Sequence, residues 1–162
     1  MGGEDFVVEQ ETRLLESQGH QVFRLEEDNR RINDISKVEL VASAFWNQKA
    51  ADALTDIIRK ESIDVVHVHN YFPLLSPSVF KAADVLGVPL VHTAHNFRLI
   101  CLNGLLFRDG RDCHDCPTLG NFLPGAIHRC YRSSLAASTV GALTLSWHKA
   151  AKTITGTVDC IV

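Results

Sequence analysis

Three histidines stand where β-strands are predicted to end. His67 and His69 lie in a β-branched run followed by Asn70, and His95 ends the next apolar run and is followed by Asn96. Side chains alternate along a strand, so His67 and His69 are predicted to share a face. Ligands of open α/β sheets bind beyond the carboxyl ends of the strands, where His69 and His95 are expected to meet. A histidine there can hydrogen-bond a ligand hydroxyl or phosphate, or act as an acid or base; packing beneath a loop is the alternative.

A pair of glycines, Gly2 and Gly3, precedes Glu4 at the start of a predicted helix. Glycines let backbone approach a ligand closely, and the N–H groups of a helix start attract anions. This segment is therefore a candidate for contact with a negatively charged ligand. The alternative is a flexible start of the chain.

Four cysteines are clustered in residues 96–132. Eleven residues separate Cys101 from Cys113, two separate Cys113 from Cys116, and thirteen separate Cys116 from Cys130. A Cys-x-x-Cys pair and two distant thiolates can complete a tetrahedral site, so the four are predicted to bind structural zinc. Ordinary reduced thiols and a redox pair are the alternatives. A fifth cysteine, Cys160, is predicted to be a small core residue.

Basic residues surround these cysteines. They could hold an anionic group such as a lipid pyrophosphate, or form a solvated surface balanced by nearby aspartates. The arginines are Arg98, Arg108, Arg111, Arg129 and Arg132.

The elements that must position these side chains alternate between helix and strand. A helix is predicted after Gly3 and ends at Gly19, and residues 20–25 alternate as a strand does. Asn47, Ser76-Pro77 and either Ser133 or Ser134 are predicted helix starts. The remaining predicted elements are helices over 38–45, 47–60, 76–86 and 133–152, and strands over 63–69, 88–93 and 158–162. Such alternation predicts an α/β fold with a Rossmann-like parallel sheet flanked by helices.

Length and composition agree with one globular domain. The chain has 162 residues, 46% of them hydrophobic and 22% charged, and a net charge of -3. This charge does not support nucleic-acid binding. No apolar stretch is long enough for a membrane span, and no secretory signal is visible, so a cytoplasmic location is expected.

Several segments together resemble the N-terminal domain of family 4 retaining glycosyltransferases of the GT-B fold. They occur in family order and at family spacing over nearly the whole chain. The segment from Asn96 to Gly104, with the later cysteines, resembles a subgroup with a cysteine-rich loop. The other segments are Gly2-Gly3-Glu4-Asp5, Gly19-His20-Gln21-Val22, residues 64–70 and residues 89–96.

The resemblance implies sugar transfer from a nucleotide-sugar donor to a glycan or lipid-linked acceptor, as in polysaccharide biosynthesis. The enzyme is expected to be of the hexosyltransferase type, with peripheral association at the inner face of the membrane. His95 is then the expected catalytic residue, and no catalytic metal is expected. The expected substrate-binding residues are Gly2, Gly3, Glu4, His69, Asn70, Asn96 and Arg98.

The resemblance also sets expectations for domain organisation. Residues 1–162 are expected to form one partial, acceptor-side domain, truncated at both ends and with a cysteine-rich insertion at about 96–132. The donor-binding domain is expected to be absent, so this piece alone is expected to be inactive. A non-catalytic, zinc-stabilised binding module is the alternative function, and a sugar-nucleotide epimerase is a third.

Overall fold

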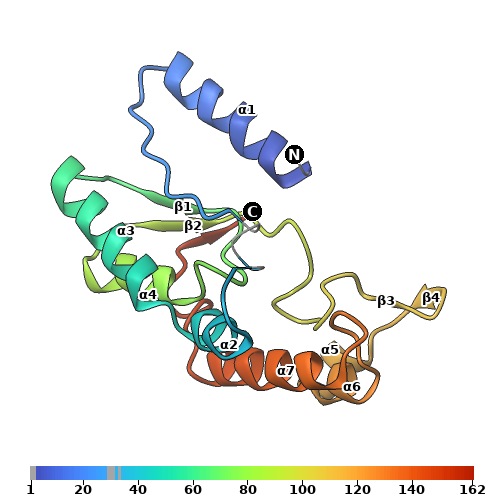
Figure 1. Cartoon of the computed structure of the whole chain (residues 1–162). Helices are drawn as coiled ribbons and strands as arrows, with labels where there is room; N and C mark the ends of the chain where they lie inside the picture. The colour runs from blue at the N-terminus through green and yellow to red at the C-terminus, as the bar shows by residue number, and fades with distance from the viewer. Residues whose placement is uncertain (1–2, 29–31, 33) are drawn as a thin grey trace. The chain divides into compact units, whose positions relative to one another are not determined.

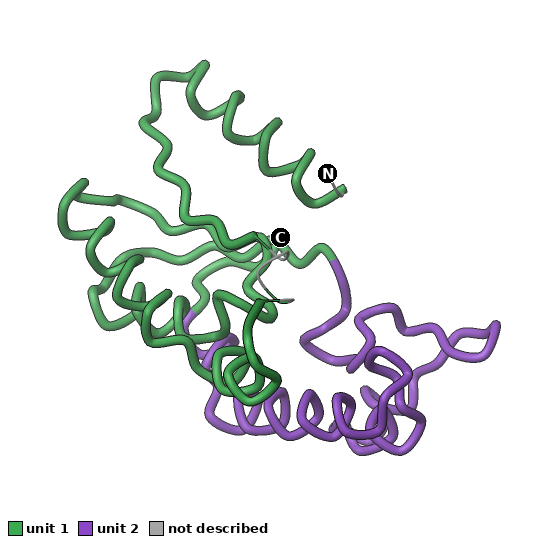
Figure 2. The backbone as a smooth tube through the Cα atoms, viewed as in Figure 1, with its two compact units in different colours: residues 1–95, 158–162 green, residues 96–157 purple. Residues whose placement is uncertain are grey.

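The structure, a computed structural model, describes residues 3–28, 32 and 34–162. The chain divides into two compact units (Figure 2). Unit 1 comprises residues 1–95 and 158–162, and unit 2 comprises residues 96–157. Gly2, a predicted substrate contact, lies outside the described residues.

Unit 1 is built on a parallel sheet, in the order β1-β2-β5 (Figure 1). Its strands are β1 (Val66–Val68), β2 (Leu90–His92) and β5 (Cys160–Ile161). The side chain of Asp159 fixes β5 beside β2, because its Oδ2 accepts a hydrogen bond from the Leu90 N–H at 2.8 Å. The predicted parallel α/β architecture is confirmed.

The helices of unit 1 begin largely where the sequence predicts. They are α1 (Gly3–Ser17), α2 (Lys37–Phe45), α3 (Gln48–Glu61) and α4 (Ser78–Val85). Asn47 caps α3 as predicted, since its Oδ1 accepts from the Ala50 N–H at 3.2 Å. Helix α4 begins one residue later than expected: Pro77 is its N-cap, and Ser76 Oγ accepts from the Ser78 N–H at 3.3 Å.

The core of unit 1 lies where α3 and α4 pack together and α4 meets the sheet. Phe80 and Leu90 are fully buried. The Phe80 ring lies edge-on to Tyr71 and His92, with centroid distances of 5.0 and 5.4 Å. His92 Nδ1 also lies 2.8 Å from the Val68 carbonyl oxygen, so a polar ring ties the ends of two strands from within the core.

Three local predictions for unit 1 are wrong. Residues 20–25 form no strand, because none of the described segments pairs with them in a hydrogen-bonded ladder. The strand predicted over 63–69 is confined to β1, and Val65 beside it is 52% exposed. Cys160 is exposed rather than a core residue, because β5 buries neither of its side chains.

Unit 2 contains a hairpin where the sequence shows little periodicity. Strands β3 (Phe107–Arg108) and β4 (Arg111–Asp112) pair in antiparallel fashion. Asp109 and Gly110 connect them with φ of 54° and 78°. Two consecutive positive φ values are the requirement of a tight hairpin turn, and an Asp-Gly pair meets it at low steric cost.

The rest of unit 2 is helical. Its helices are α5 (Asp115–Leu119), α6 (Leu123–Ile127) and α7 (Leu135–Ala150). Ser134 caps α7 as predicted, accepting from the Ala137 N–H at 3.3 Å. Leu102 is 1% exposed at the centre of a small core with Phe122, Ala126, Ala142 and Leu145.

Candidate functional site

The ends of β1 and β2 bring the predicted histidines together. His69 Nδ1 lies 3.0 Å from His95 Nε2, and the two rings are stacked with centroids 5.3 Å apart. His67 shares the face of His69, with ring centroids 4.2 Å apart. Its Nε2 lies 2.8 Å from Thr93 Oγ1. The alternation of β1 and its register with β2 therefore place three imidazoles and a hydroxyl at one edge of the sheet.

Helix α1 adds carboxylates to these strand ends. Glu4 and Glu11 are seven residues apart, close to two helical turns, so they lie on one face of the helix. Glu4 Oε2 accepts from Asn70 Nδ2 at 2.6 Å. Glu11 Oε2 lies 3.2 Å from His69 Nε2 and 3.7 Å from His67 Nδ1. We call Glu11, His67, His69 and His95 the histidine cluster.

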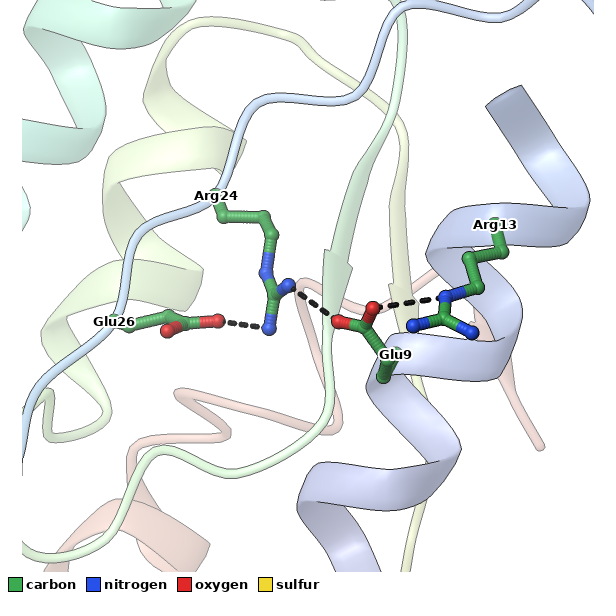
Figure 3. Close-up of polar contacts among 4 residues, drawn as sticks. All are labelled: Glu9, Arg13, Arg24 and Glu26. Atoms are coloured by element: carbon green, nitrogen blue, oxygen red, sulfur yellow. Dashed lines mark hydrogen bonds and ion pairs between the residues drawn. The ribbon is translucent and has the colours of Figure 1, made fainter.

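A chain of ion pairs on another face of α1 holds the helix to the following segment (Figure 3). Glu9 accepts from Arg13 at 2.9 Å and from Arg24 at 3.0 Å, and Arg24 also pairs with Glu26. The hydrogen bonds from Arg24 and Arg13 lower the pKa of Glu9. These contacts are exposed, so their strength depends on ionic strength.

Burial controls the charge of the strand-end histidines. Desolvation lowers the pKa of His67 below its ordinary value, and Glu11 opposes that shift. Desolvation also lowers the pKa of His69, and the positive charge that His67 would carry adds to this effect. Both rings are therefore biased toward the neutral form, in which one ring nitrogen donates and the other accepts.

These contacts form a polar path from a carboxylate through two imidazoles. Glu11 Oε2 lies 3.2 Å from His69 Nε2, and its negative charge favours a proton on that nitrogen. A neutral His69 then accepts at Nδ1 from His95 Nε2–H. The Nδ1 of a neutral His95 is left with a lone pair, which can accept a proton or a hydrogen bond from a ligand hydroxyl.

Within the described residues, one group of three or more metal-ligand side chains has its ligand atoms within 4.8 Å of one another: Glu11, His67 and His69. The four cysteines of unit 2 form no such group, although all are free thiols. Burial raises the pKa of Cys116 and of Cys130. Zinc coordination would require these sulfurs to move closer together and lose their protons.

The remaining predicted site residues are more scattered. Gly3 begins α1 and is exposed. Asn96 and Arg98 belong to unit 2, where Asn96 Oδ1 accepts from the Arg98 N–H at 3.0 Å and so shapes a turn.

Two residues of the site escaped prediction, Glu11 and Thr93. Glu11 interrupts the apolar pattern of α1, and its seven-residue spacing from Glu4 is the signal that marks it. Thr93 follows β2 directly, two residues before the predicted His95. Its side-chain contact with His67 becomes apparent only once the strands are paired.

The fold defines unit 1 as a Rossmann-like α/β unit, with a polar site at the carboxyl ends of its strands. The family profile described as Glycosyltransferase Family 4 matches residues 1–111. The chain therefore belongs to glycosyltransferase family 4. The matched range includes Cys101 and ends before Cys113, Cys116 and Cys130.

No curated protein and no solved structure gives a significant match to the chain. Among the described residues, none of the helices has the length and apolar character needed to cross a membrane.

Proposed function

We propose that unit 1 is the acceptor side of a glycosyltransferase that transfers a hexose from a nucleotide sugar to a glycan or lipid-linked acceptor. The path from Glu11 through His69 to His95 carries this proposal. It lies at the carboxyl ends of neighbouring parallel strands, the position where α/β folds bind ligands. The family supports the reaction class.

In this proposal His95 contacts the reacting sugar, and Glu11 and His69 orient it. The carboxylate favours the tautomer in which His95 Nδ1 accepts a hydrogen bond. Glu4 and Asn70 hold each other at 2.6 Å, and would present the remaining amide and carboxylate groups to acceptor hydroxyls. Gly3 and the start of α1 would lie closest to the donor phosphates.

The second part of the proposal concerns unit 2. A structural zinc held by Cys101, Cys113, Cys116 and Cys130 would organise a segment whose secondary structure is short. The supporting observations are that all four cysteines lie in one compact unit and that none forms a disulfide. The zinc would have no part in sugar transfer.

The test is sugar transfer or nucleotide-sugar hydrolysis by a polypeptide carrying this chain with a family donor-binding domain. Replacing His95→Ala is expected to lower turnover about tenfold or more, the scale of a lost acid–base or positioning contact. The matched control is His20→Ala, because His20 is exposed. Full turnover by the His95 variant would remove His95 from the mechanism. No detectable reaction with any UDP- or GDP-sugar would favour a binding module. The 162 residues alone are expected to bind acceptor without efficient transfer.

A further inference from the structure

One ring nitrogen of His67 and one of His69, which we call the inner nitrogens, lie near the same carboxylate oxygen of Glu11. The ligand atoms of Glu11, His67 and His69 all lie within 4.8 Å of one another. Glu11 Oε2 is 3.2 Å from His69 Nε2 and 3.7 Å from His67 Nδ1. Nitrogen and oxygen ligands lie about 2.0–2.2 Å from zinc, so ligands of a tetrahedral ion are roughly 3.3–3.6 Å apart. The observed spacings therefore bracket those of an occupied site.

The other ring nitrogen of each of these histidines, the outer nitrogen, also has a hydrogen-bond partner. His67 Nε2 lies 2.8 Å from Thr93 Oγ1, and His69 Nδ1 lies 3.0 Å from His95 Nε2. Metal-bound histidines characteristically have a hydrogen-bond partner on the ring nitrogen that does not bind the metal, because it fixes the ring orientation and the tautomer. The cluster thus has both an inner set of ligand atoms and an outer set of supports.

We propose that Glu11, His67 and His69 bind a divalent first-row transition metal ion, for which Zn²⁺ is the probe. Two imidazoles and one carboxylate suit zinc and its neighbours better than Mg²⁺ or Ca²⁺, which prefer oxygen ligands. The three side chains are 39%, 31% and 13% exposed in the order Glu11, His67, His69, so solvent reaches the cluster. A tetrahedral ion there keeps one position for water or for an oxygen of a ligand.

The ion would reverse the hydrogen-bonding role of His95 Nδ1. This effect links the metal site to the proposed function, but the metal site does not depend on that function. A metal on His69 Nε2 takes that lone pair, so the neutral ring carries its proton on Nδ1 and donates it toward His95 Nε2. A neutral His95 then has its proton on Nδ1. His95 would therefore offer a donor to a ligand when the metal is bound and an acceptor when it is absent.

The experiment titrates the chelator-treated full chain with Zn²⁺ and, in parallel, with Co²⁺. Binding by nitrogen and oxygen gives Co²⁺ visible d–d bands without the near-ultraviolet sulfur-to-metal charge transfer that cysteine ligation produces. The Glu11→Gln variant is expected to bind at least about tenfold more weakly, since even outer-sphere changes cost tenfold or more. The matched control is Glu16→Gln on the same helix, because Glu16 is exposed. The control is expected to bind as the unchanged chain does.

A second measurement needs no variant. Nitrogen-15 spectra of the histidine rings are expected to show Zn²⁺ shifting His67 Nδ1 and His69 Nε2 and leaving His20 unchanged. Cobalt spectra with sulfur ligation alone, or zinc that moves none of these ring nitrogens, would overturn the metal site. Sugar transfer, after complete metal removal, by the polypeptide that joins this chain to a donor-binding domain would not contradict metal binding at this site. It would show that transfer does not need the metal. Loss of transfer with metal binding intact would count against the proposed function alone.

Discussion

The histidine cluster of unit 1 and the cysteines of unit 2 are both sets of metal-ligand side chains, but they are held in different ways. His67 lies in the paired strand β1, His69 and His95 follow the ends of β1 and β2, and α1 brings Glu11 to 3.2 Å from His69. Of the four cysteines of unit 2, Cys116 lies in the five-residue helix α5 and the other three lie outside helices and strands, and the four sulfurs are not gathered. Strand pairing thus builds a site before any ligand arrives.

This difference predicts opposite relations between ion binding and folding. A prebuilt site binds an ion with little rearrangement. A set of separated thiols must be drawn together, so its binding free energy becomes folding free energy. What holds unit 2 without an ion is its apolar core around Leu102. This contrast would be wrong if the stability of unit 2 did not depend on metal. It would also be wrong if unit 1 needed a metal ion at the histidine cluster in order to fold.

The largest expected effect comes from the cysteine pair. Replacing Cys113→Ser and Cys116→Ser together is expected to abolish zinc-dependent protection in unit 2, because two of four thiolate ligands are lost. Amide hydrogen exchange should then speed up several-fold or more in α5 and α6 and remain unchanged in β1 and β2. Two replacements that leave exchange and zinc content as they were would show that these are ordinary thiols. The matched control is Cys160→Ser, because Cys160 is an exposed cysteine of unit 1.

A smaller effect is expected where the core of unit 2 is tightest. A methyl group on Gly125 would lie 2.7 Å from Leu102 Cβ, closer than real side chains approach. We expect Gly125→Ala to lower the unfolding free energy of unit 2 by about 1–3 kcal/mol through overpacking. Chemical denaturation followed by Trp147 fluorescence measures it.

The graded control for this change is Gly141→Ala on α7. Its added methyl would meet only Leu102 Cδ1, at 3.1 Å, so the contact can relax more easily. A larger loss for Gly141→Ala than for Gly125→Ala would contradict the packing around Leu102. The outcome makes the contrast between the units more precise, because it measures how much of the unfolding free energy of unit 2 comes from apolar packing.

The difference between the units also explains what sequence could predict. Helix starts at Asn47 and Ser134 and the meeting of His69 with His95 followed from caps and alternation, which are local properties. Residues 20–25 alternate as a strand does but pair with none of the described strands, and strand formation depends on a neighbouring strand as well as on the sequence pattern. Glu11 joined the site through polar side-chain contacts between α1 and the strand ends, which short-range periodicity does not specify.

The smallest expected effect is a pH dependence of opposite sign in the two units. His92 is 3% exposed, and burial lowers its pKa below the unfolded value. Between those two pKa values the unfolded state binds more protons, so stability falls on acidification and the loss is complete below the folded pKa. The neighbouring charges of His95 and His67 act in the same direction.

In unit 2 burial raises the pKa of Cys116 and Cys130 above the unfolded value. The folded state then keeps protons that the unfolded state releases, so stability falls as pH rises above the ordinary thiol range. Each group can change the unfolding free energy by at most about 1.4 kcal/mol per pH unit. The chain has two tryptophans, Trp46 in unit 1 and Trp147 in unit 2. Trp46→Phe and Trp147→Phe therefore let fluorescence follow one unit at a time in denaturant series from about pH 5 to about pH 10.

With chelator and reductant present, the Trp46 signal is expected to report acid destabilisation and the Trp147 signal alkaline destabilisation. Adding zinc should weaken the alkaline limb if the thiols become metal-bound thiolates, because they then have no proton to lose. Identical pH profiles for both tryptophans would mean that the units unfold as one. That result would show that the two units unfold in a single cooperative transition. The cysteines and the histidines would then both contribute to one unfolding free energy.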